Sequence, residues 1–300
     1  MTMKRAISIT FCTFFIALLA VAQGDAVAEA ATKYREGDLR GAQSLLDGAA
    51  KDPAMATSVE MWVLRGFVYK DLYKTAPTGQ ADILRDEAMA SLYTAIGLDK
   101  NRQYAESSEA AYRFLAKTIY NDAVHAMNTL NADRAIGLYG KYQGALRRLD
   151  PDRPTTDSDI EFNNALGTVY VKLFTRDRGQ NRWYEKAIDV YKHVLVLDSN
   201  NYGANYNLAT LYYNRGVYNI QQISADNDIP SLQQIQEASR GFFTLALPYM
   251  LKAHRMKPDR PETILGLEGI HYSLQDERQS KYYRHLYEEL KHDEKKGKDQ

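Results

Sequence analysis

The stretch "NYGANYNLATLYYNRG", from Asn201 to Gly216, contains the pattern that decides the fold. Its large apolar and aromatic side chains recur at helical spacing: Tyr206, Leu208, Leu211, Tyr212 and Tyr213. Small residues alternate with them: Ala204, Ala209 and Gly216. The stretch therefore predicts a helix that neighbouring helices approach closely, and it holds no obvious catalytic group.

The same order of a large, a small and an aromatic residue occurs elsewhere in the chain. The three sets are Trp62, Gly66 and Tyr69; Leu166, Gly167 and Tyr170; and Leu208, Ala209 and Tyr212. Self-similarity of this kind is typical of repeat architectures. We therefore interpret the opening stretch as one unit of a repeated scaffold rather than as an isolated site.

Signals for the end of a helix also repeat. Residues 147–154 read "RRLDPDRP" and residues 254–261 read "HRMKPDRP", so both close a helical run with the same four residues. Looser versions lie around Pro53, Lys100 and Ser199. Each supplies an acidic or polar residue followed by Pro, Asn or Lys, and each predicts that a helix ends and the chain turns.

The runs before these stops place an alanine one turn before a large residue. Ala187 precedes Tyr191 in this way, and Ala246 precedes Met250. This alternation resembles the tetratricopeptide repeat, in which a small residue on one helix lets the other helix approach and large residues fill the space on both sides.

The turn between the two helices of that family also has a counterpart here. Residues 34–46, "YREGDLRGAQSLL", are similar to it, with Gly37, Asp38 and Ala42 in place. The resemblance implies an all-α fold, a right-handed α-solenoid of about six antiparallel helix pairs over residues 26–290. The last helix begins amphipathic and becomes highly charged, as a solvent-facing cap should.

The spacing departs from this family. Successive stops are 47, 51, 48 and 59 residues apart, whereas the family period is 34. We therefore expect elongated helices or inserted loops in several units. Asp228 suits a helix cap and Pro230 a first turn after one hairpin tip, "ADNDIP". Other tips are expected at residues 74–80, 128–133 and 175–182.

A rival interpretation of the same spacing exists. HEAT and armadillo units have periods near 40 to 47 and would need no insertions. Both interpretations predict an all-α solenoid without strands, so the fold class does not depend on the choice.

The first 22 residues have the features of a secretory signal peptide. Lys4 and Arg5 precede the apolar run "AISITFCTFFIALLAVA", which ends in a small-x-small pattern at Ala22. We expect cleavage after Ala22, with Ala28 as a later alternative. An uncleaved membrane anchor is the other possibility, although the run is slightly shorter than the roughly 20 residues that a spanning helix needs.

The composition after cleavage is that of an exported globular protein. The only cysteine, Cys12, lies in the apolar run and would be removed with it. The full chain has 38 basic and 38 acidic residues, so no global field draws it to nucleic acid or anionic lipid. The expected organisation is a signal peptide at 1–22, a repeat domain at 23–290 and a charged tail at 291–300, with no stable membrane span after cleavage.

No pattern in the sequence predicts catalysis or a bound metal. The six histidines, at positions 125, 193, 254, 271, 285 and 292, lack the spacing with a carboxylate that defines a zinc protease helix. His193 and His254 are expected on second helices as surface or interface residues. Phosphate-binding loops and nucleophile elbows are absent, and no basic stripe supports nucleic acid binding. We therefore expect a non-enzymatic protein without a cofactor, a metal or a nucleic acid partner.

The surface that remains is the concave groove created by stacked helix pairs. By resemblance to the family, groove positions lie on first helices between the packing residues. They are Asn164, Thr168 and Lys172 in one unit and Tyr206, Asn207, Thr210, Tyr213 and Asn214 in the next. Asn can pair with a peptide backbone, and Tyr offers rigid contact area.

The basic clamp that some family members use for a carboxylate is not evident. Arg65 and Arg215 could supply charge, but Arg215 is expected at a helix end, where compensation of the helix dipole would account for it. The resemblance implies an adaptor that binds a protein or peptide in the periplasm or outer envelope of a bacterium. The alternatives are a structural subunit of an envelope complex and an accessory that presents a cell-wall polysaccharide to an enzyme.

Overall fold

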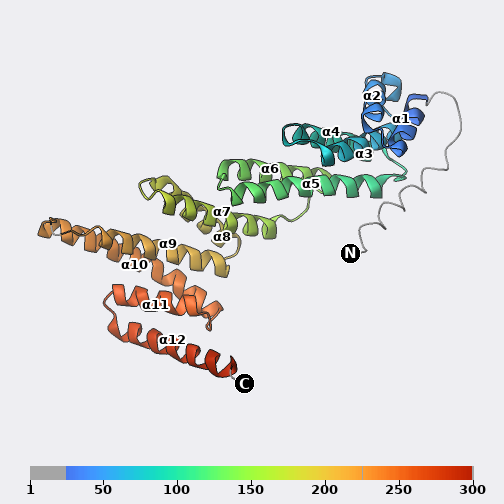
Figure 1. The fold of residues 1–300 in the computed structure, drawn as a ribbon. Helices are drawn as coiled ribbons and strands as arrows, with labels where there is room; N and C mark the ends of the chain where they lie inside the picture. Colours follow the sequence, from blue (N-terminus) through green and yellow to red (C-terminus); the bar gives the residue numbers. More distant parts are fainter. Residues whose placement is uncertain (1–24, 225, 299–300) are drawn as a thin grey trace. The chain divides into compact units, whose positions relative to one another are not determined.

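The computed structural model describes residues 25–224 and 226–298, and within these residues the fold is entirely helical, without β-strands. Figure 1 shows the helices in chain order. They are α1 (Asp25–Glu36), α2 (Leu39–Ala49), α3 (Val59–Thr75), α4 (Thr78–Leu98), α5 (Ala105–Asn128), α6 (Ala132–Leu149), α7 (Thr156–Arg176), α8 (Asn181–Leu197), α9 (Tyr202–Gln221), α10 (Ile229–Met256), α11 (Pro261–Ser273) and α12 (Glu277–Lys298). A short 3-10 helix, η2 (Pro53–Met55), precedes α3. The all-α prediction is confirmed, and the expected signal segment with Cys12 lies outside the described residues.

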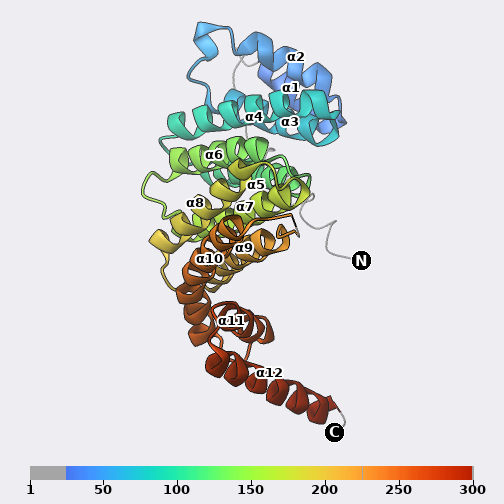
Figure 2. The same ribbon diagram turned by 90° about the vertical axis from the view of Figure 1, so that its left-hand side faces the viewer.

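Consecutive helices pack as hairpins, which Figures 1 and 2 show from two directions. The pairs α1/α2, α3/α4, α7/α8, α9/α10 and α11/α12 are in contact, and α2, α8 and α10 also contact the helix that follows. The Tyr120 ring of α5 lies 6.3 Å and 5.2 Å from the Tyr139 and Tyr142 rings of α6. The chain divides into two compact units, of which one ends at Ile119 and the other begins at Tyr120, inside α5.

Three hairpins, α1/α2, α5/α6 and α11/α12, have the same turn. Its central residue adopts a left-handed conformation, with φ of 85° at Gly37, 59° at Leu130 and 64° at Gln275. In each case this residue donates its N–H to the carbonyl three positions back, and the next residue donates to the carbonyl five positions back. Gly37 was expected in the turn between two helices. Leu130 and Gln275 hold the conformation without a glycine, at a cost of roughly 1–2 kcal/mol each.

The residue after the left-handed one caps the second helix of each hairpin. Its side-chain oxygen accepts the backbone N–H three positions later, at 2.9 Å for Asp38, 3.2 Å for Asn131 and 3.2 Å for Asp276. Four residues after the cap, a small side chain is almost completely buried: Ala42, Ala135 and Ser280. Turn, cap and buried small residue therefore recur as a unit.

The helix stops predicted from the repeated "PDRP" residues have matching geometry. Arg153 donates its N–H to the Asp150 carbonyl at 3.2 Å, and Arg260 donates to the Lys257 carbonyl at 3.3 Å. Asn201 makes the equivalent bond to Asp198. Each of these turns directly follows the end of a helix, so the stops are confirmed as helix ends.

Close helix contact explains two of the small residues. A Cβ atom added at Gly167 of α7 would lie 2.5 Å from Cε1 of Tyr191 on α8. A Cβ added at Gly216 of α9 would lie 2.5 Å from Cε1 of Phe243 on α10. Both distances are far shorter than a van der Waals contact, so these positions need glycine for the rings to pack as they do.

The extra residues between stops lengthen the helices. The first hairpin has helices of 12 and 11 residues, whereas α9 and α10 have 20 and 28. Asp228 caps α10 by accepting the Ser231 N–H at 2.9 Å, and Pro230 lies in the first turn, as expected. The predicted tips fall between helices in the other units too. At the carboxyl end, α12 continues through the expected tail as far as Lys298.

Candidate functional site

Two of the three predicted groove residues on α7 are engaged in contacts within the fold. Asn164 donates its amide to Oδ1 of Asn201 at 3.1 Å, and the same oxygen caps the first turn of α9. The Thr168 hydroxyl lies 3.1 Å from the Asn164 carbonyl oxygen and 3.4 Å from the Tyr191 hydroxyl. Lys172 is exposed. Asn164 and Thr168 thus have clear structural partners.

The five predicted residues on α9 lie in different environments. The Tyr213 ring packs 5.6 Å from Phe243, and a Cβ added at Gly269 of α11 would lie 2.7 Å from the Tyr213 hydroxyl oxygen. Tyr213 therefore fills space between α9, α10 and α11. Three of the others are half-buried or exposed: Asn207, Thr210 and Asn214. Among the described residues, no hydrogen bond or ring contact joins these five to the three on α7.

Tyr206, the fifth predicted residue, stacks on a second ring at the start of α9. The Tyr202 ring lies one turn earlier, with centroids 6.0 Å apart and planes inclined by 6°. The Lys257 ammonium, from the turn after α10, lies 4.4 Å from the centroid of the Tyr202 ring. A cation at this distance is attracted to the ring face. We call Tyr206, Tyr202 and Lys257 the aromatic ladder.

A carboxylate fixes the middle of the aromatic ladder. The Tyr202 hydroxyl donates to Oε1 of Glu262 at 3.2 Å, and Nε of Arg260 donates to the same oxygen at 2.7 Å. Burial raises the pKa of Tyr202, and the Glu262 charge raises it further. Burial alone would also raise the pKa of Glu262, but hydrogen bonds from its own backbone and from Arg260 hold that pKa below its usual value. At neutral pH, Tyr202 is therefore a neutral donor to an ionised Glu262.

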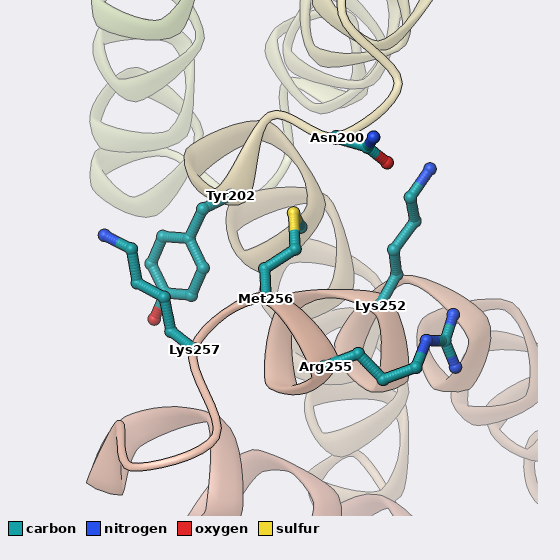
Figure 3. Close-up of a pocket in the computed structure, with 6 residues that line it drawn as sticks. All are labelled: Asn200, Tyr202, Lys252, Arg255, Met256 and Lys257. Atoms are coloured by element: carbon teal, nitrogen blue, oxygen red, sulfur yellow. The ribbon is translucent and has the colours of Figure 1, made fainter.

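An open pocket of about 660 Å³ adjoins the ladder. Six residues from the start of α9 and the end of α10 line it: Asn200, Tyr202, Lys252, Arg255, Met256 and Lys257. Figure 3 shows Lys252 and Arg255 on one side of Met256, with Lys257 beside the Tyr202 ring on the other. Pockets of this volume are large enough for a small ligand or for one side chain of a partner.

The pocket lining is basic. Lys252, Arg255 and Lys257 make no ion pair with any residue that the structure describes. Cations near a helix carboxyl end stabilise the helix dipole, and Arg255 lies in the last turn of α10. Compensation of the helix dipole explains why the charge at the end of α10 is positive. It does not explain why an open pocket surrounds that charge. The arrangement suits an anionic group from a partner.

The two arginines considered as sources of charge have other roles. The Arg65 guanidinium is paired with Asp47 at 2.9 Å and with Glu87 at 2.8 Å, so its charge is neutralised. The expectation that Arg215 lies at a helix end is wrong, because α9 continues to Gln221. The Arg215 guanidinium instead lies 5.4 to 5.9 Å from three ring centroids: Phe174, Tyr184 and Tyr218.

Sequence reasoning did not single out two exposed apolar side chains on the next helix. Leu265 and Tyr272 are 40% and 71% exposed on α11, the helix that follows the pocket. They are seven residues apart and so share a helical face. Because α11 is apolar on most sides, its periodicity does not separate exposed from buried positions. Arg255 and Lys257 of the pocket were interpreted from the sequence only as part of the helix stop at residues 254–261.

The histidines are dispersed. His193 is exposed on α8, and His254 on α10 lies edge-on to Tyr283 at 5.6 Å, so both are on second helices as predicted. His271 Nδ1 lies 3.3 Å from Oδ2 of Asp276. In the part of the chain that the structure describes, no three His, Cys, Asp or Glu side chains are grouped so that they could hold a metal ion.

No family model and no curated protein matches this chain. Among the helices of residues 25–224 and 226–298, none is both long enough and apolar enough to cross a bilayer. Inferences about function therefore rest on the geometry of the site.

Proposed function

We propose that this protein is an exported, non-enzymatic scaffold of the tetratricopeptide type, a right-handed solenoid of about six helix pairs, that binds a protein or peptide partner in the bacterial envelope. The observation that supports this best is the aromatic ladder beside a pocket whose three cations make no ion pair within the described residues. The recurring turn, cap and buried small residue of three hairpins support the repeat assignment.

The site would bind a peptide through non-covalent contacts and would not catalyse a reaction. The stacked rings of Tyr206 and Tyr202 are pre-ordered, so a partner that covers them costs little side-chain entropy. Lys252 and Arg255 would receive an acidic side chain or another anionic group of the partner, since neither makes an ion pair with a residue that the structure describes. The exposed Leu265 and Tyr272 would extend the contact to apolar residues.

The electrostatics favour binding over acid–base catalysis. The pKa of Tyr202 is raised, so this hydroxyl remains protonated and is a hydrogen-bond donor at neutral pH. Glu262 has a lowered pKa and is occupied by Tyr202 and Arg260, so it is a poor proton acceptor. The proposed binding of a peptide therefore requires neither a cofactor nor a metal.

A peptide selection tests this proposal. The full chain is used to select from a displayed random peptide library, and the enriched peptides are measured by fluorescence anisotropy. We expect peptides with one or two acidic residues next to an aromatic or aliphatic residue. Lys252→Gln with Arg255→Gln should weaken their binding by about tenfold to a hundredfold, as loss of charge-assisted contacts costs roughly 1.5–3 kcal/mol.

A matched control separates the pocket from general charge. Arg278→Gln with Lys117→Gln removes two exposed cations elsewhere in the chain. This variant should bind the selected peptides as the unmodified chain does. Enrichment without acidic residues, or equal weakening by both double variants, would contradict the proposal.

A further inference from the structure

The turn between α7 and α8 gathers positive charge that the fold does not neutralise. Arg176, Arg178 and Arg182 are exposed there, and none makes an ion pair with a described residue. Residues 172–186 hold five basic side chains and only two acidic ones. This local excess exists in a chain whose formal net charge is zero.

Positive charge is unfavourable at the amino-terminal end of α8. This helix has no acidic residue in its first turn, and its cap residue, Gln180, makes no side-chain capping bond. Arg182 lies in that first turn, where the helix dipole is positive and a cation is unfavourable. The Arg182 guanidinium lies 4.3 Å from the centroid of the Trp183 ring, but a ring contact does not neutralise its charge. A charge that opposes a local rule in this way points to selection for function.

Apolar side chains lie on the neighbouring hairpin. The Arg178 guanidinium lies 4.8 Å from the centroid of the Tyr218 ring near the end of α9, so the two hairpins meet at this point. Beyond it, Ile220 and Ile229 are 39% and 71% exposed. Both turns lie at the left of Figure 1. We call the three arginines with Ile220 and Ile229 the tip edge.

We propose that the tip edge docks on an anionic lipid surface. The arginines would contact lipid phosphates, and the two isoleucines would enter the boundary between headgroups and acyl chains. Guanidinium groups combined with exposed aliphatic groups fit a lipid surface better than a purely acidic partner, which would not cover the isoleucines. Asp226 and Asp228 also lie at this tip, but Asp228 is occupied in capping α10.

The tip edge is separate from the aromatic ladder. Tyr202 and Ile220 are at opposite ends of α9, roughly 27 Å apart along the helix axis at 1.5 Å per residue. The two surfaces can therefore be tested independently, and neither proposal depends on the other.

Vesicle flotation tests the lipid proposal. The full chain is mixed with vesicles of phosphatidylcholine, with or without phosphatidylglycerol, so that any contribution of the amino-terminal residues is the same in every variant. We expect binding that requires phosphatidylglycerol. Replacing Arg176, Arg178 and Arg182 with Gln should weaken it by roughly a hundredfold, about fivefold per cation near an anionic surface.

The control is a variant with the same loss of charge. Lys51→Gln, Lys117→Gln and Arg278→Gln remove three exposed cations that lie outside the tip edge. This triple variant should lose less than threefold in binding, and the circular dichroism spectra of both triple variants should match that of the unmodified chain. Equal weakening of the two variants would overturn the proposal, as would equal binding to both kinds of vesicle.

The isoleucines provide a second readout. Electrostatic attraction is screened as salt rises, whereas burial of apolar groups persists. Ile220→Ser with Ile229→Ser should therefore reduce the fraction bound at high salt more than the fraction bound at low salt. If vesicles fail to bind while a protein is captured only when the three arginines are present, the partner is a protein and the lipid proposal is wrong.

Discussion

Replacing Gly167 with Ala tests the close approach of α7 and α8. The added Cβ would lie 2.5 Å from Cε1 and 2.6 Å from Cζ of Tyr191, whose side chain is fully buried. Ordinary carbon contacts are about 3.5–4.0 Å. The ring or the helix must therefore move, and such overpacking costs about 1–3 kcal/mol. Because Ala gains about 1 kcal/mol over Gly in a helix, we expect a net loss of up to about 2 kcal/mol.

Gly144 provides the matched control for this substitution. It lies in α6 of the same unit, it is exposed, and a Cβ added there would meet nothing within 4 Å. Gly144→Ala should therefore stabilise the protein by roughly 0.5–1 kcal/mol. Urea unfolding followed by far-ultraviolet circular dichroism measures both variants. If Gly167→Ala were as stable as Gly144→Ala, the packing of Tyr191 against α7 would be refuted.

Three further substitutions test single features. Gln275→Gly should stabilise the α11/α12 turn by about 1 kcal/mol in thermal unfolding, because glycine adopts the left-handed conformation without strain; no gain would contradict the turn geometry. Arg65→Gln should destabilise by about 1–3 kcal/mol in urea, because Asp47 and Glu87 would lose their shared partner. Burial lowers the pKa of His254 below its usual 6.5, so its contribution to stability should be complete above pH 6.5 and should decline as pH falls toward the folded-state pKa. His254→Gln should remove that part of the pH dependence of the melting temperature, and an unchanged profile would exclude His254 as its source.

The sequence was sufficient for the helical scaffold because stops and small residues are local signals. The "PDRP" stops and the cap at Asp228 depend on a few adjacent residues, and both lie where they were expected. The left-handed turns at Leu130 and Gln275 were not predicted, since the usual signal is glycine and these positions lack it. The following Asn131 and Asp276 were the available clue, because a capping residue marks the helix start.

The candidate site was predicted only in part because it is formed by side chains from separate helices. Tyr206 was selected from its place on α9, and its stacking on Tyr202 is local to that helix, whereas the approach of Lys257 depends on how α10 ends beside α9. Tyr213 was selected by the same helical position and proves to be a packing residue. Helical periodicity assigns a face to a residue, but it does not show which neighbouring helix covers that face.

Hydrogen–deuterium exchange with a bound peptide tests the binding proposal most directly. The full chain is measured alone and with the tightest acidic peptide from the selection. We predict that added protection is confined to segments 199–210 and 252–273, which hold the aromatic ladder, the pocket and the exposed face of α11. Protection located only in residues 25–119, or unchanged exchange throughout at a saturating peptide concentration, would contradict the claim that this surface is the binding site.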